Sequence, residues 1–174
     1  MATFTERMLG AARLDPRTYE EVEADTGATA QALGVVVLTG LASGIGLGAG
    51  ATGLVLGTLA TVLGWYVWAF ITYFVGTRWL PEPQTHADWG QVLRTVGFAN
   101  APGILRVLGI VPFLRGIVFV VTAVWVLVAV VIAVRSALDY TSTLRAVGVC
   151  IVGWIIQWLI FGLAAALIGA PPAG

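Results

Sequence analysis

The residues from Thr26 to Thr77 contain no charged side chain, and this feature restricts the fold more than any other. One membrane-spanning helix needs about 20 mostly apolar residues to cross about 30 Å of hydrocarbon, so this stretch is long enough for two. The glycine-rich segment 46–53 favours a break between them. We predict a first span near Gln31–Gly48 and a second near Thr52–Gly76.

Three more apolar runs follow along the chain. The first of them, Val92–Val111, is interrupted by Arg94 and Arg106, whereas Gly116–Val134 and Ala146–Ile168 carry no charge. The predicted fold class is therefore all-α, a polytopic membrane helical bundle with five transmembrane helices over residues 28–170. A short N-terminal helical segment, residues 1–27, precedes it.

Composition excludes several classes of protein. The chain is 59% hydrophobic and 10% charged, against about 45–50% and about 25% in soluble domains. Nine arginines balance nine acids without any lysine, so no basic field could hold a nucleic acid. With one Cys and one His, we expect no disulfide framework, no metal site and no cofactor, and no nucleophile and base stand together as a catalytic pair.

The N-terminal segment predicts two short helices. The first ends near Leu14, and Asp15 caps a second in which Pro16 takes the first position. The first helix could lie in the membrane interface as an amphipathic collar, dock a soluble partner or be a disordered lead. The arginines and acids of residues 1–25 precede any apolar run, so we expect a cytosolic segment and no signal peptide.

Arginine counting predicts the orientation. With a cytoplasmic N-terminus and five spans, seven arginines lie inside and only Arg106 and Arg115 outside, as the positive-inside rule requires. The uncharged tail, residues 170–174, is then expected on the opposite side from the N-terminus.

Small residues recur every four positions in the first span, at Gly40 and Gly44. This spacing lets two helix backbones approach closely in lipid. The partner could be a neighbouring helix of the same chain or a second copy of the protein, and the spacing leaves both open.

The third span contains Asn100 and Pro102, where an ordinary span would be aliphatic. Pro102 removes one backbone hydrogen bond, so we expect a kink or break, with Asn100 bonding another helix. Arg106 lies about 18 Å beyond Arg94 if the helix continues. It either snorkels outward from a short span or lines a polar cavity.

Polar residues near the cytoplasmic ends complete the candidates. Asp88, or Thr85 before it, can cap the helix leading into the third span. Arg135 and Asp139 are spaced for a salt bridge on one helical face, and Asp139 could instead pair with Arg94. Gln157 is a candidate for an interhelical hydrogen bond. The candidate functional positions are Asp88, Arg94, Asn100, Pro102, Arg106, Arg135 and Asp139.

Two sequence elements, VGFANAPGIL at 96–105 and ALDYTSTLRAVGV at 137–149, together with five spans and a cytosolic N-terminus, resemble the Yip domain family of Ypt/Rab-interacting membrane proteins. The resemblance extends from about Phe4 to about Ile160. It implies a helical membrane domain without known catalysis, whose eukaryotic members are tied to vesicle traffic, Rab-type GTPases and self- or hetero-association. This chain lacks their acidic, aromatic and proline-containing cytosolic motif, so a small GTPase partner rests on distant family analogy.

The residues favour two functions. The first is a non-enzymatic membrane protein that organises other membrane components, with lipids, a second copy or other membrane proteins as partners. The second is a small transporter, channel or lipid-handling protein that uses the broken third span. The Ala, Gly, Val and Arg bias without lysine is typical of GC-rich coding, so we expect a bacterial cytoplasmic membrane.

Overall fold

The computed structural model describes residues 2–169, with side chains through 160 and at 162, 163 and 166, and this part of the chain is helical without strands. The predicted placement of the tail 170–174 lies outside the described residues. The elements are α1 (Phe4–Ala12), α2 (Pro16–Ala24), α3 (Ala28–Leu47), α4 (Ala51–Phe74), the π-turn η1 (Val75–Trp79), α5 (Trp89–Phe98), the 3₁₀ helix η2 (Ala101–Ile110), α6 (Arg115–Ala137) and α7 (Thr143–Gly169).

Four helices in the described part are long and apolar enough to cross a membrane. They are Ala28–Leu47, Ala51–Trp79, Arg115–Ala137 and Thr143–Ile160, and they correspond to the predicted first, second, fourth and fifth spans. The predicted third span is two pieces, α5 and η2, of 10 residues each. Because each piece is about half the length that a bilayer needs, the structure has four single helices of spanning length where five were expected.

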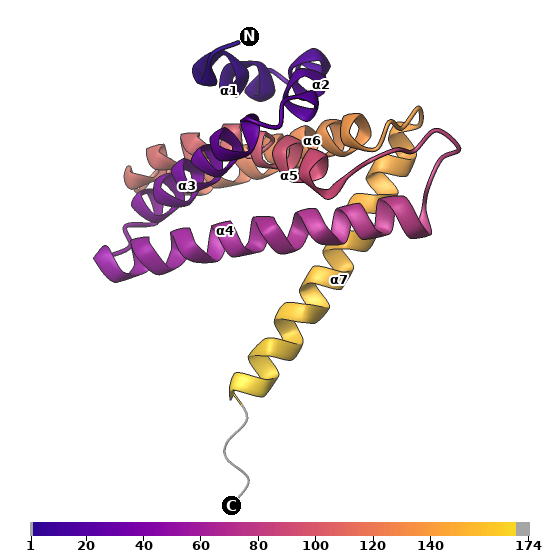
Figure 1. Cartoon of the computed structure of the whole chain (residues 1–174). Helices are drawn as coiled ribbons and strands as arrows, with labels where there is room; N and C mark the ends of the chain where they lie inside the picture. Colours follow the sequence, from indigo (N-terminus) through magenta and orange to yellow (C-terminus); the bar gives the residue numbers. More distant parts are fainter. Residues whose placement is uncertain (1, 170–174) are drawn as a thin grey trace, which may run out of the picture.

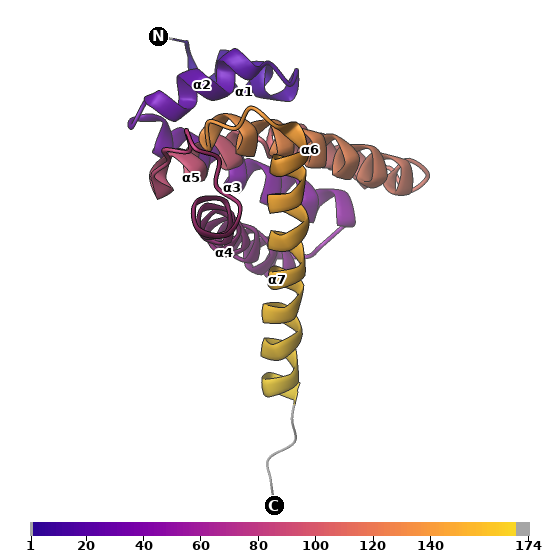
Figure 2. The same ribbon diagram turned by 90° about the vertical axis from the view of Figure 1, so that its right-hand side faces the viewer.

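The helices form a layered bundle from which the last one departs. In Figure 1, α1 and α2 lie across α3, α5 and α6, and α4 runs below them. The turn between α3 and α4 uses Gly48, whose φ of 71° is a left-handed conformation that glycine adopts without strain. Figure 2 shows α7 extending well beyond the other helices toward the C-terminus.

The two N-terminal helices are part of the packed core. Asp15 caps α2 and Pro16 is its first residue, as predicted. Ala11, Tyr19 and Val22 are fully buried, and the Tyr19 hydroxyl donates to the Ala11 carbonyl at 3.0 Å. The indole N–H of Trp125, in the middle of α6, donates to the Ala12 carbonyl at 2.8 Å. A disordered N-terminal lead is therefore wrong.

The core of the bundle combines small residues with tryptophans. Ala32 and Val36 of α3 and Ala133 of α6 are fully buried, and Trp65 and Trp68 of α4 nearly so. By contrast, the outer faces of α4, α6 and α7 expose many large aliphatic side chains. Such wide apolar surfaces fit a bundle whose outer face contacts lipid.

The break in the third apolar run positions η2 against α3. The α-helix ends at Phe98, and the 3₁₀ helix begins at Ala101, directly before Pro102. A Cβ at Gly46 of α3 would overlap the carbonyl oxygen of Arg106 in η2. Only glycine permits this close approach of two backbones. Gly46 therefore lets η2 pack directly against the backbone of α3.

Candidate functional site

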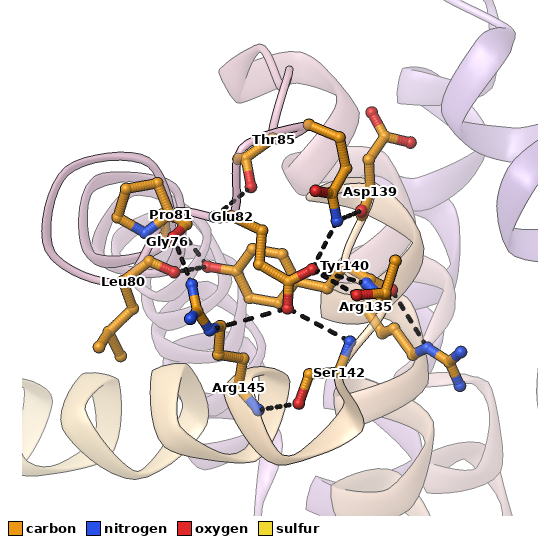
Figure 3. A network of polar contacts seen from close by, with 12 residues as sticks. Gly76, Leu80, Pro81, Glu82, Thr85, Arg135, Asp139, Tyr140, Ser142 and Arg145 are labelled. Atoms are coloured by element: carbon orange, nitrogen blue, oxygen red, sulfur yellow. Dashed lines mark hydrogen bonds and ion pairs between the residues drawn. The ribbon is translucent and has the colours of Figure 1, made fainter.

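Glu82 is the centre of a polar network between two loops (Figure 3). It lies in the loop before α5, and only 8% of it is exposed. Its carboxylate accepts from the Thr141 N–H at 2.9 Å, the Thr141 hydroxyl at 2.8 Å and the Ser142 N–H at 3.2 Å, and Arg145 Nε lies 3.7 Å away. The hydrogen bonds from Thr141 lower the pKa of Glu82 to about 2. The carboxylate therefore stays charged and fastens the start of α7.

Tyr140 strengthens the same junction. Its hydroxyl lies 2.9 Å from the Gly76 carbonyl and 2.7 Å from the Leu80 carbonyl. Burial raises the pKa of Tyr140 to about 12, so the phenol remains a donor. At the backbone of the same residue, Arg135 Nε donates to the Tyr140 carbonyl at 3.2 Å. The end of α4, the loop before α5 and the α6–α7 loop are thus joined.

Arg7 fastens the N-terminal helices to one another and to α3. Its side chain is 2% exposed and pairs with Glu21 at 2.9 Å and with Asp25 at 2.7 Å. It also donates to the Gln31 side chain at 3.3 Å. These ion pairs lower the pKa values of Glu21 and Asp25, so the contact persists under mildly acidic conditions.

Arg94, a candidate from the sequence, caps the C-terminus of α2. It is 5% exposed, and its guanidinium donates to the Val22 carbonyl at 3.3 Å and to the Glu23 carbonyl. A cation here complements the negative end of the helix dipole.

We call the end of the bundle formed by residues 2–27, 75–94 and 135–145 the polar face.

The pairings expected for Asp139 are wrong. Within residues 2–169 its carboxylate pairs neither with Arg94 nor with Arg135. The reason is that α6 ends at Ala137, and Asp139 adopts a φ of 53°, which takes it off the helical line assumed in the prediction. Arg135 instead bonds the Tyr140 carbonyl and the Thr143 hydroxyl.

Glu23 is a half-buried carboxyl of the polar face. It borders a pocket of about 580 Å³ together with Glu20 and Asp139. Burial and the nearby charge of Asp139 raise the pKa of Glu23 to about 7, although Arg94 opposes the shift. This carboxyl therefore titrates near neutral pH.

Asp88 begins α5, as predicted. Its side chain accepts from the Gln91 N–H at 2.9 Å, and the Gln91 side chain accepts from the Asp88 N–H at 2.6 Å. This reciprocal pair is a capping box. Asp88 therefore has a structural role as the N-cap of α5.

The break at Asn100 is held by hydrogen bonds of two kinds. The Asn100 amide donates to the Val96 carbonyl of its own helix at 2.9 Å, and the Asn100 carbonyl accepts from the Thr39 hydroxyl of α3 at 3.0 Å. The expected bond from the Asn100 side chain to another helix is therefore wrong: the side chain closes α5, and the backbone carbonyl makes the contact with α3. Pro102 is buried directly after it.

Arg106 borders a pocket of about 640 Å³ between α4, α6 and α7. Its Nε donates to the Thr122 hydroxyl at 3.2 Å, and its guanidinium carbon lies 5.7 Å from the centre of the Phe119 ring. Gln157 lines the same pocket, but its Oε1 is buried without a hydrogen-bond partner. Arg106 thus borders a cavity, and the lining of this cavity is mostly apolar, where one of the two expectations was a polar lining.

Gly40 and Gly44 face α4 of the same chain. A Cβ at Gly40 would lie 3.0 Å from the Thr58 backbone, and one at Gly44 would lie 2.8 Å from the Leu54 side chain. The small-residue face therefore packs within the α3–α4 hairpin.

Sequence reasoning missed Glu82 and Arg7. Glu82 stands alone among Leu80, Pro81 and Pro83, and a single acid in such an apolar, stiff setting was an available signal. Arg7 gave none, because its partners Glu21 and Asp25 lie in the next helix. The described residues contain no group of three His, Cys, Asp or Glu side chains that could hold a metal ion.

Comparison with known proteins gives one match. The family model of the Yip1 domain matches residues 15–168, from the cap of α2 to the end of α7. No curated protein and no solved structure matches the chain.

Proposed function

The chain belongs to the Yip1 domain family, and from this premise we propose that it is a non-enzymatic integral membrane protein that organises or interacts with other membrane components. The observation that carries the proposal is the polar face. Its buried charges, Arg7, Arg94 and Glu82, all fasten one segment to another. A surface fixed before binding loses little entropy when a partner docks, which suits a protein whose work is association.

The proposed topology has five crossings with the N-terminus in the cytoplasm of a bacterial cell. The third crossing would combine α5 and η2, whose 10 residues each give about 15 Å as α-helix and about 20 Å as 3₁₀ helix. The arginines of the polar face support this orientation, since cytoplasmic ends are enriched in basic residues.

The proposed partners are a second copy of the chain or other membrane proteins, and a small GTPase is supported by family analogy alone. Arg13, Arg17 and Glu20 are exposed on the N-terminal helices and offer charges to such a partner. Chemical crosslinking in native membranes, read by mass spectrometry, tests the proposal. We expect crosslinked species above the monomer, which weaken when the charges of Arg17 and Glu20 are both reversed.

The contact is proposed for the part of the polar face on α1 and α2, so reversal of the exposed Arg78, elsewhere on that face, is the matched control and should leave the crosslinked species unchanged. Thermal unfolding of each variant separates loss of association from loss of fold. If the unaltered protein gives only monomer in its own membrane, the organising role is contradicted.

A second candidate function, as a small transporter, channel or lipid-handling protein, is favoured by the pocket at the broken third run. Single cysteines at positions 100 and 106 in a Cys150→Ser background, with position 139 as the cytoplasmic control, test for an aqueous path. Labelling of 100 and 106 by an impermeant thiol reagent outside the cell would favour a channel or transporter. Protection of both positions would contradict an open aqueous path.

A further inference from the structure

The pocket beside Arg106 lies within the membrane-spanning part of the bundle. Its lining comes from the middle of α4, α6 and α7, and each of these helices is long and apolar enough to span a bilayer. Four tryptophans form much of its wall: Trp65, Trp68, Trp154 and Trp158. The polar residues Thr61, Asn100, Arg106 and Gln157 also border it. A cationic group thus faces a largely apolar chamber.

The charge of Arg106 has no counter-charge within the described chain. All nine acidic residues lie in residues 2–169, and the ion pairs there use only Glu21, Asp25 and Glu82. The hydroxyl of Thr122 and the ring of Phe119 are neutral partners, and the hydroxyl engages only Nε. An unpaired charge at membrane depth is costly, so an anion from outside the chain would stabilise this arrangement.

An open apolar face of α7 adjoins the pocket. It is formed by Ile151, Trp154, Ile155, Trp158 and Leu159. Trp154 and Trp158 belong both to this face and to the wall of the pocket. Beyond these residues α7 extends away from the other helices, as Figures 1 and 2 show. The pocket with its cationic group therefore lies beside an apolar helix face.

We propose that the pocket beside Arg106 binds a phospholipid, with its phosphate on the guanidinium of Arg106 and an acyl chain against the tryptophans and the apolar face of α7. A guanidinium presents planar pairs of N–H donors that match phosphate oxygens. A molecule with one anionic end and a long apolar tail matches both the unpaired charge and the apolar wall. The inference rests on the second candidate function, because it names an occupant for the same pocket, but it requires binding and not transport.

Native mass spectrometry of the full chain in an uncharged detergent tests the proposal. The probes are phosphatidylglycerol, a galactolipid with the same acyl chains but no phosphate, and inorganic phosphate alone. We expect the protein to retain phosphatidylglycerol at least tenfold more tightly than the galactolipid. Arg106→Gln should remove at least tenfold of that affinity, and Arg106→Lys should lose less because the charge remains.

Two further variants keep the test decisive. Arg115→Gln is the matched control, since Arg115 bonds only the Gly109 carbonyl and should change lipid binding less than twofold. Ala123→Trp fills the pocket while leaving Arg106 in place, and it should also abolish retention. This variant tests the site even if Arg106→Gln does not fold.

Three results would overturn the proposal: equal retention of both lipids, equal affinity of the wild-type and Arg106→Gln proteins, or binding of inorganic phosphate as tight as that of the phospholipid. Transport is read separately, as movement of a labelled phospholipid between the leaflets of vesicles holding the protein. Binding without movement supports the site and contradicts lipid transport. Movement that survives Arg106→Gln contradicts the site and leaves transport standing.

Discussion

The polar face and the break at Asn100 use buried arginines in opposite ways. At the polar face, Arg7 and Arg94 are 2% and 5% exposed, and each binds carboxylates or helix-end carbonyls of another segment. At the break, Arg106 is partly buried beside neutral groups alone. The contrast teaches that a buried charge is structural when its own chain supplies the partner, and is available for binding when it does not.

The largest expected effect comes from adding a methyl group at Gly46, where η2 packs against α3. Gly46→Ala places a methyl group where the Arg106 carbonyl oxygen lies, and neither backbone can yield as a flexible side chain would. We expect a loss of about 3 kcal/mol in the free energy of unfolding, measured by thermal or denaturant unfolding in detergent. Gly57→Ala in α4 is the control, because nothing lies within 4 Å of its added Cβ, and it should be neutral or slightly stabilising.

The next effect separates the two kinds of arginine directly. Arg94→Met leaves the Val22 and Glu23 carbonyls without their donor and should cost about 2 kcal/mol. Arg106→Met removes a charge that no acid of the chain balances, so stability without added lipid should be unchanged or higher. Equal losses in the same unfolding measurement would show that the two arginines do not differ in role.

A smaller effect depends on acidic pH and tests the network of Glu82. Folding lowers the pKa of this carboxyl from 4.5 to about 2, so its stabilising contribution is fully present above about 4.5 and is lost as the pH falls toward 2. Glu82→Gln should therefore be less stable than wild type at neutral pH, and the difference should shrink across this window. A difference that is constant from pH 6 to pH 2 would exclude a role for the charge.

The smallest effect has the opposite sign and concerns Glu23. Folding raises its pKa from 4.5 to about 7, so the charged form costs stability once the pH rises through this range. Glu23→Gln should stabilise the protein at pH 8 and change nothing below about pH 4. The facing charges are Asp139, Arg94, Glu20 and Asp88, and Glu20→Gln, at an exposed position, should give a weaker response. A benefit that is equal at both pH values would point to packing instead.

The sequence predicted the helices better than it predicted their contacts. Long uncharged runs located α3, α4, α6 and α7, and Asp15, Asp88 and Pro102 marked helix ends, because caps and proline act through neighbouring backbone groups. The partners of Arg94 and Glu82 lie far along the chain, on the ends of α2 and α7, and side-chain spacing carries no signal for a backbone partner. The Arg135–Asp139 pair failed for a local reason, since the helix ended two residues before Asp139.

The two short pieces at the break also constrain how the protein enters its membrane. Neither α5 nor η2 is long enough to partition into hydrocarbon by itself, and each carries an arginine that insertion scales penalise by about 3 kcal/mol at the centre of a helix. Their insertion becomes favourable only through contacts with α3, namely the hydrogen bond from the Thr39 hydroxyl and the close backbone approach at Gly46. Because α3 and α4 come earlier in the chain, they are synthesised before α5 and η2. The surface against which these two short pieces pack is therefore made first.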